Sequence, residues 1–204
     1  MELIGTREQR DQQRLDNLPA TFTAKAARGA GLSWEALYRL RDQQSLVELS
    51  RGVFRRTGAG PSSMPDLLAV SARAPQGMIC LVSALQYWGL TDEMPGAVDL
   101  AVPRGSHRPV ISYPPTKVHV FDAATFSLGR LQAPVGADDH IAVSDRERTI
   151  VDCFRPRTGV GTSVSYSALR AYMAAPGARP GRLLDMAREL RAFGTVRHAL
   201  EVLG

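Results

Sequence analysis

The segment "TAKAARGAGLSWEALYRLRDQQSLVELSRGVFRR", residues 23–56, decides the fold of the amino-terminal part of this chain. Gly31 can take a left-handed backbone conformation without a Cβ clash, so it can end one helix just before Ser33 caps the next. Residues 46–49 and 53–56 have the pattern of two short strands joined by a turn. This order predicts a winged helix-turn-helix module.

The second predicted helix, which begins after Ser33, has an apolar face and an outward face. Ala36, Leu37 and Leu40 share the apolar face at helical spacing. The outward face is aromatic and bears arginine, and such a helix can enter a DNA major groove, where arginine pairs with guanine. The candidate DNA-binding residues, with arginines of the wing for phosphates, are Arg28, Ser33, Trp34, Tyr38, Arg39, Arg41, Arg51, Arg55 and Arg56.

Two features of this segment weigh against a simple assignment. Residues 20–58 hold seven basic and three acidic side chains, which is a modest surplus. Helix-turn-helix pairs also serve as packing or dimerisation modules, and a few arginines often form only a solvated face. The second helix should end near Gln44, where glycine would be the easier stop signal.

The composition is that of an ordinary globular protein. The chain has 204 residues, 44% hydrophobic and 22% charged, which suits one domain or two small ones and excludes a disordered protein. A formal net charge of +5 favours an anionic partner. However, Lys25 and Lys117 are the only lysines among 25 basic residues, an arginine bias that indicates GC-rich coding DNA, as in actinobacteria.

The sequence carries no pattern for export, membrane insertion or metal binding. The amino terminus is polar and charged, and no apolar run approaches the length of a membrane span, so we expect a cytoplasmic protein without a membrane partner. Cys80 and Cys153 lie in apolar segments without the spacing of a zinc site, and the histidines are scattered. We therefore expect buried, reduced thiols and no bound metal.

The chain divides at a segment rich in glycine, proline and serine. Thr6 and Gln9 have the spacing of a capping box at the start of a first helix. Residues 57–65 show no apolar periodicity, as is typical of a linker. We predict a DNA-binding domain at residues 1–58, a linker at 59–64 and a second domain at 65–204.

The second domain mixes strand and helix patterns. Strand-like runs occur at residues 97–103, 117–123 and 140–144, followed by a helix pattern at 145–155. After Ser165, three amphipathic segments predict packing helices. The predicted fold class is α+β: an amino-terminal winged helix-turn-helix, then a mixed α/β domain with carboxy-terminal helices.

Three segments in this order resemble the AbiEi family of antitoxins from type IV toxin-antitoxin systems. They are "LSRGVFRR" at residues 49–56, "LVSALQYWGLTDEMPGAVDLAVPRG" at 81–105 and "SDRERTIVDCFR" at 144–155. The resemblance implies a winged amino-terminal module that binds operator DNA upstream of its own operon. It also implies a carboxy-terminal domain that neutralises a neighbouring nucleotidyltransferase-like toxin.

The second domain lacks common catalytic signatures. It has no GxxxxGK[ST] loop, no paired carboxylates of a nucleotidyltransferase and no kinase HRD or DFG element. One alternative is an atypical serine/threonine protein kinase acting on the toxin, which would need carboxylates for Mg²⁺ and cations for ATP phosphates. Residues of the right type are Asp99, Arg104, Lys117, Arg148 and Asp152.

Two further interpretations stay open for this domain. An aspartate in an apolar element with an arginine nearby is more often a buried structural pair than a catalytic group. The same sequence features would also fit a plain transcriptional regulator that has no partner toxin.

Overall fold

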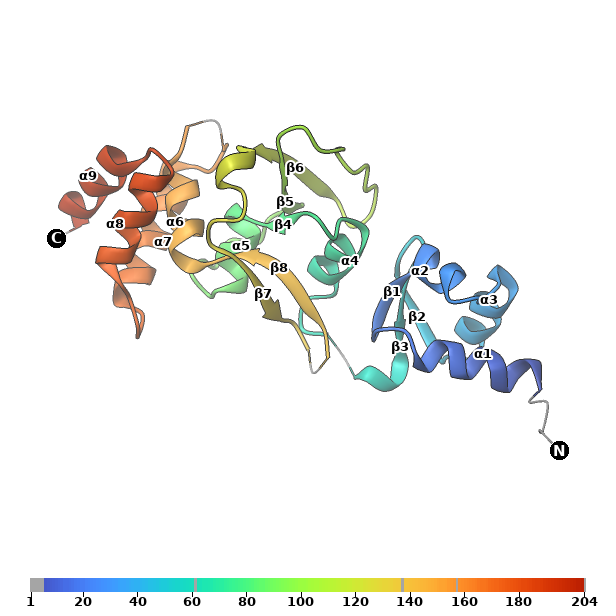
Figure 1. Cartoon of the computed structure of the whole chain (residues 1–204). Coiled ribbons are helices and arrows are strands. Elements are labelled where there is room, and N and C mark those ends of the chain that lie inside the picture. Colours follow the sequence, from blue (N-terminus) through green and yellow to red (C-terminus); the bar gives the residue numbers. More distant parts are fainter. Residues whose placement is uncertain (1–5, 61, 137, 157, 204) are drawn as a thin grey trace. The chain divides into compact units, whose positions relative to one another are not determined.

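The computed structural model describes residues 6–60, 62–136, 138–156 and 158–203 (Figure 1). The described residues form two compact units. Unit 1 extends to Ala74 and includes Pro134–Ile141. Unit 2 consists of Pro75–Ala133 and the chain from Ala142 onward. The protein is therefore a mixed α and β structure with two separate cores.

Unit 1 combines helices with a three-stranded antiparallel sheet of order β1-β3-β2. The central strand pairs Phe54 with Phe22 on one side and with Glu48 on the other. In chain order its elements are α1 (Arg7–Asp16), β1 (Thr21–Thr23), α2 (Ala24–Gly29), α3 (Trp34–Asp42), β2 (Leu46–Ser50), β3 (Val53–Arg56), η1 (Thr57–Ala59) and α4 (Pro65–Arg73).

The first helix begins where the capping box was predicted. The Thr6 amide donates to Gln9 Oε1 at 2.8 Å, and the Gln9 amide donates to Thr6 Oγ1 at 3.3 Å. These bonds satisfy two amides that have no partner within the helix. The helix is polar except for Leu15, which is buried in the core of unit 1.

The turn between α2 and α3 is built as the sequence predicts. Gly31 has φ +89°, its amide donates to the Arg28 carbonyl, and the Leu32 amide donates to the Ala27 carbonyl. This is a Schellman ending, which needs a left-handed residue after the helix. Ser33 then caps α3, its Oγ accepting from the Ala36 amide at 3.0 Å.

Helix α3 ends in the same way, but with a glutamine at the left-handed position. Gln44 has φ +58°, its amide donates to the Arg41 carbonyl, and the Ser45 amide donates to the Leu40 carbonyl. The prediction that the helix stops here is confirmed. Glutamine takes the place of the expected glycine and bears the steric cost of its Cβ.

Replacing Gln44 with glycine is expected to raise the free energy of unfolding of unit 1 by about 0.5–1 kcal/mol, because glycine takes this conformation without strain. The measurement is urea denaturation in a Trp88→Phe background, followed by the fluorescence of Trp34. Gln43→Gly is the matched control, because Gln43 is also exposed and has φ −78°. If both variants were destabilised equally, the left-handed strain at Gln44 would be negligible.

The boundary between the units lies later in the chain than predicted. Leu67, Leu68 and Val70 of α4 are buried, and this helix packs against β1, β2 and β3. The segment 59–64 is therefore a connection within unit 1 rather than a linker between domains. The prediction failed because the glycine and proline pattern marks a loop, but not which core the next helix joins.

Unit 2 contains a five-stranded mixed sheet of order β6-β5-β4-β8-β7. Strands β5 and β6 are parallel, as are β4 and β8, while β4 and β5 are antiparallel. Its elements are β4 (Met78–Ile79), α5 (Leu81–Tyr87), β5 (Val98–Pro103), β6 (Thr116–Phe121), η2 (Ala123–Thr125), β7 (Arg130–Pro134), β8 (His140–Ser144), α6 (Arg146–Phe154), α7 (Thr162–Ala174), α8 (Pro180–Glu189) and α9 (Phe193–Leu203).

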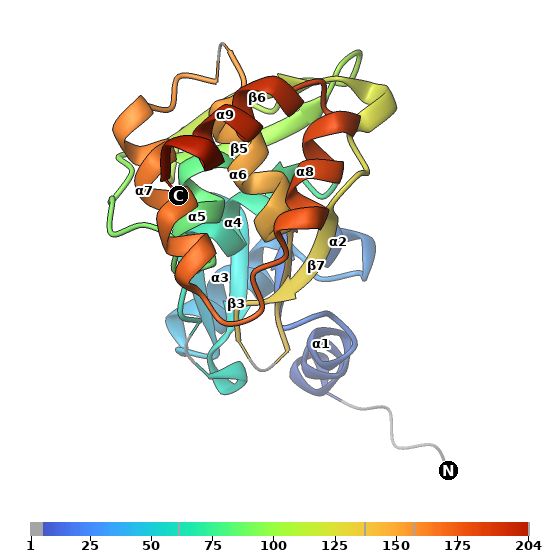
Figure 2. The ribbon, with the colours of Figure 1, turned by 90° about the vertical axis from the view of Figure 1, so that its left-hand side faces the viewer.

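The helices of unit 2 form layers beside this sheet (Figure 2). Helix α5 packs against β5 and α6, and α6 in turn packs against α7, α8 and α9. The buried apolar residues of α6 and of the three last helices join one core. The predicted carboxy-terminal packing helices are thus part of unit 2. In the part of the chain that the structure describes, no helix has the length and hydropathy to cross a membrane.

Candidate nucleic-acid interface

The outward face of α3 carries two exposed aromatic side chains. Trp34 and Tyr38 are 45% and 44% exposed, and their rings stack at a centroid distance of 5.9 Å. The Arg41 guanidinium carbon lies 4.9 Å from the centroid of the Tyr38 ring. We call Trp34, Tyr38 and Arg41 the aromatic ladder. Its members are spaced at i, i+4 and i+7, so one stripe of the helix presents all three to solvent.

The opposite face of α3 explains why the ladder points outward. Ala36, Leu37 and Leu40 are at most 5% exposed and belong to the core of unit 1 with Leu32 and Phe54. Burying these apolar side chains fixes the rotation of the helix about its axis. Large aromatic side chains left in water by a fixed helix are typical of surfaces that bind a partner.

Positive charge near the ladder is partly balanced. Arg41 forms ion pairs with Asp42 at 3.0 Å and with Glu48 at 3.6 Å, and its hydrogen bond to Asp42 raises its pKa. It is still 40% exposed. Arg28 on α2 and Arg51 in the β2–β3 turn are exposed as well. Of the predicted DNA-binding arginines, Arg28, Arg41 and Arg51 are thus open to solvent. Arg56, at the end of the hairpin, is partly exposed.

Two predicted arginines are instead engaged within unit 1. Arg55 is 4% exposed and forms a buried ion pair with Asp139. It also donates to Thr21 Oγ1 at 3.0 Å. The prediction that Arg55 contacts phosphates from the wing is therefore wrong. Arg39 donates to Asp11 Oδ2 at 2.7 Å, and its side chain is 27% exposed.

The position of Arg55 in the sheet explains the difference. Strand β3 is paired along both edges, and the successive residues Val53, Phe54 and Arg55 are all buried, so both of its faces are covered. Arg56, the last residue of the strand, is partly exposed. Neighbouring residues of a strand point to opposite faces, so Arg55 and Arg56 lie on different faces of β3. Two adjacent arginines look alike in the sequence, and only the elements packed on each face decide which of them is buried.

The predicted catalytic carboxylate Asp152 is part of a buried ion-pair network. Arg148 Nε donates to its Oδ2 at 2.7 Å, and Arg155 Nη1 donates to its Oδ1 at 2.9 Å. Both Asp152 and Arg148 are fully buried. Because Asp152 and Arg148 are cut off from solvent and Asp152 is paired with two arginines, the structure favours a buried structural pair over the predicted catalytic roles of these two residues.

Other polar residues of the segment "SDRERTIVDCFR" also hold unit 2 together. Asp145 caps α6, with its Oδ1 accepting from the Arg148 amide at 2.7 Å. Glu147 is buried and accepts hydrogen bonds from Tyr172 Oη and Arg179 Nε, each at 3.0 Å. This motif is therefore a structural network around α6.

No hydrogen bond or ion pair among the described residues joins the remaining predicted catalytic residues, Asp99, Arg104 and Lys117, to one another. Asp99 lies 2.7 Å from His119 Nε2, and Lys117 is exposed. Arg104 lines a hollow beside β6 that contains neither Asp99 nor Lys117. Among the described residues, no group of three or more histidine, cysteine or acidic side chains could hold a metal ion.

Both thiols are buried, as expected. Cys80 and Cys153 are free cysteines in the core of unit 2. Burial raises the pKa of both thiols far above the usual range, so the nucleophilic thiolate form is disfavoured.

The comparisons with known proteins relate this chain to others by fold. No family model matches the chain, and no curated protein matches it. Among solved structures, the crystal structure of the RV2827C protein from Mycobacterium tuberculosis has a TM-score of 0.54 at 17% sequence identity. The match covers 92% of this chain and 73% of that one. At this identity the likeness establishes a shared fold alone.

Proposed function

We propose that this chain is a DNA-binding antitoxin that represses its own operon and neutralises a neighbouring nucleotidyltransferase-like toxin in the cytoplasm. Unit 1 would bind the operator as a winged helix-turn-helix. Unit 2 would act on the toxin, as the resemblance of its sequence to the AbiEi family implies. The observation that carries the DNA-binding part is the exposed aromatic ladder on α3.

The order of elements in unit 1 supports the winged-helix assignment. Helix α1 is followed by β1, then α2 and α3, then the β2–β3 hairpin. Helices α2 and α3 are joined by the Gly31 turn, which is the arrangement that presents a second helix to the major groove. The hairpin carries Arg51 at its exposed turn, where a wing would reach a phosphate.

The side chains of the ladder can bind the base edges and phosphates of DNA. An arginine can donate two hydrogen bonds to guanine, and tyrosine can reach a phosphate or a base edge. The stack of Trp34, Tyr38 and Arg41 restricts the rotamers of all three side chains before binding. Less conformational entropy is then lost when a partner is bound.

Arg41→Ala and Tyr38→Ala should each weaken binding to the operator by about 1–3 kcal/mol, because each removes one contact with a base or phosphate. The measurement is a titration of the duplex upstream of the coding sequence, with unrelated duplex DNA as competitor. Arg10→Ala is the matched control, since Arg10 is an exposed arginine on α1.

The same variants separate the two proposed activities. Cells that express the neighbouring toxin with Arg41→Ala should still grow, because antitoxicity is assigned to unit 2. Equal operator binding by Arg10→Ala and Arg41→Ala would contradict the assignment of the surface. Failure of the unchanged protein to rescue growth would leave a transcriptional regulator without antitoxin activity.

A further inference from the structure

Strand β6 is an edge strand of the five-stranded sheet, and one row of its backbone groups faces away from the sheet. It pairs with β5 alone, in parallel. The Val98 amide donates to the Pro115 carbonyl, and the Arg104 amide donates to the Phe121 carbonyl. Odd-numbered residues of β6 therefore point their amides and carbonyls toward β5. The even-numbered Val118 and Val120 point theirs outward.

A hollow of about 470 Å³ lies along this free edge. Val118 and Val120, whose backbone groups point outward, are among the residues that line it. None of the described residues forms a hydrogen bond with the outward amides or carbonyls of these two valines. An exposed edge with this row of donors and acceptors is a template for another strand.

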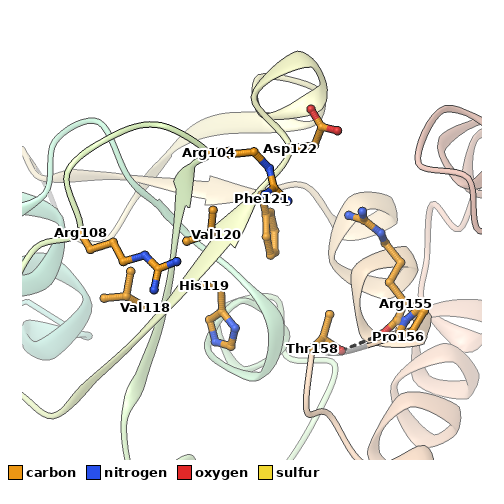
Figure 3. A pocket seen from close by; sticks show the side chains of 10 residues that line it. All are labelled: Arg104, Arg108, Val118, His119, Val120, Phe121, Asp122, Arg155, Pro156 and Thr158. Atoms are coloured by element: carbon orange, nitrogen blue, oxygen red, sulfur yellow. Dashed lines mark hydrogen bonds between the residues drawn. The ribbon is translucent and has the colours of Figure 1, made fainter.

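Three arginines line the hollow beside this edge strand (Figure 3). Arg108, from the β5–β6 connection, lies beside Val118, and Arg104 lies close to Phe121. Arg155 and Thr158 come from the segment after α6. The lining is thus contributed by segments far apart in the sequence, which meet around β6.

The charge of this lining is positive and mostly unbalanced. Arg104 and Arg108 are exposed, and no ion pair joins either of them to another residue in the described part of the chain. Arg155 and Arg148 both form ion pairs with Asp152, but 28% of the Arg155 side chain is exposed. Asp122 is the acidic residue in the lining. A carboxylate-bearing ligand would complement this surface.

We propose that the free edge of β6 binds an extended, acidic segment of a protein partner as an additional strand. The partner's backbone would pair with the outward amides and carbonyls of Val118 and Val120. Carboxylates of the added strand would bind Arg104 and Arg108, which follow β5, and Arg155, which follows α6 on the other side of the hollow. This mode of binding takes affinity from backbone hydrogen bonds and specificity from side chains.

The backbone edge favours a peptide over a nucleic acid as the occupant. A phosphate backbone would use the arginines, but it has no alternating donors and acceptors to match a strand edge. The inference is also independent of the proposed operator binding, because it concerns residues of unit 2. Loss of DNA binding in an α3 variant would leave it standing.

The test uses the full chain and a fluorescein-labelled peptide of about eight residues, the length of an ordinary strand. Its sequence places one valine and one threonine between pairs of glutamates. Neighbouring glutamates point to opposite faces, so both faces of the added strand carry carboxylates. Fluorescence anisotropy should show saturable binding. Hydrogen exchange of the Val118 and Val120 amides should slow roughly tenfold at a free peptide concentration of about ten times Kd.

Two comparisons separate strand pairing from charge attraction. Methylation of the central peptide amides removes donors without changing charge, and should abolish binding. The double variant Arg104→Glu/Arg108→Glu should weaken binding by roughly tenfold or more. Arg170→Glu, at an exposed arginine of α7, should leave it unchanged.

Three results would overturn the proposal. The first is the absence of saturable binding by the unmethylated peptide. The second is equal binding of the methylated peptide or of a single-stranded oligonucleotide of the same charge, since the surface would then be a general anion site. The third is binding without slower exchange at Val118 and Val120, which would place the peptide elsewhere.

Discussion

Replacing Asp152 with alanine is expected to lower the free energy of unfolding of unit 2 by about 3–5 kcal/mol. Arg148 is fully buried, and its Nε donates to Asp152 at 2.7 Å. Without the carboxylate, a guanidinium would remain in the core without its counter-ion. The two carbonyls that accept from Arg148 Nη1, those of Thr125 and Leu128, cannot neutralise the charge.

A double-mutant cycle distinguishes the loss of the pair from the loss of volume. Arg148→Met/Asp152→Leu removes both charges and keeps apolar volume, so it should be less destabilised than the sum of the single variants by about 1–3 kcal/mol. Trp34 and Trp88 are the two tryptophans of the chain. Urea denaturation in a Trp34→Phe background therefore reports on unit 2 through Trp88.

This prediction also decides how catalysis could be tested. If Asp152→Ala unfolded at the same urea concentration as the unchanged protein, the pair would not be structural, and a catalytic role would need to be considered again. If the variant loses stability as expected, the absence of kinase activity in it would be explained by unfolding and would not show that Asp152 is catalytic.

Replacing Arg55 with methionine should destabilise unit 1 by about 3–5 kcal/mol rather than change the salt dependence of DNA binding. The variant leaves the Asp139 carboxylate buried without its cation. It also removes donors to the carbonyls of Ala59 and Gly60, which hold the segment after β3. The loss combines an unpaired buried charge with unsatisfied carbonyls.

The matched control for Arg55 is its neighbour in the sequence. Arg56 is partly exposed and its side chain forms no ion pair within the described residues, so Arg56→Met should cost less than about 1 kcal/mol. Both are measured by urea denaturation in a Trp88→Phe background, with Trp34 as the reporter of unit 1. Equal costs at positions 55 and 56 would mean that the Arg55–Asp139 pair adds nothing to folding.

The helices were the most predictable elements of this fold. Local sequence predicted three of their features, each from residues a few positions apart: the capping box at Thr6, the left-handed turn at Gly31 and the cap at Ser33. The three last helices followed from amphipathic spacing in the same way. Strands β1 and β7 were missed, because one has three residues and the other exposes Leu131 where a core residue would mark a strand.

The candidate surfaces were predictable to different degrees. The ladder on α3 could be predicted because helical periodicity separates Leu37 and Leu40 from Trp34 and Tyr38. The cationic hollow beside β6 was not predicted; of its arginines, only Arg104 was a candidate from the sequence, as a cation for ATP phosphates. The sequence gives no signal that Arg108 and Arg155 lie near the same strand, because the sheet order and the α6–α7 connection bring them there.

The sequence by itself determined where helices start and stop, and which face of α3 is apolar, because caps, turns and helical spacing act between neighbours in the chain. Only the tertiary structure decided that Arg55 is buried while Arg51 is exposed, that Asp152 is held by two arginines, and that β6 is an edge. The physical reason is that burial and ion pairing depend on which distant segments cover a residue. A side chain's type fixes its charge, but the free energy of that charge is set by its surroundings.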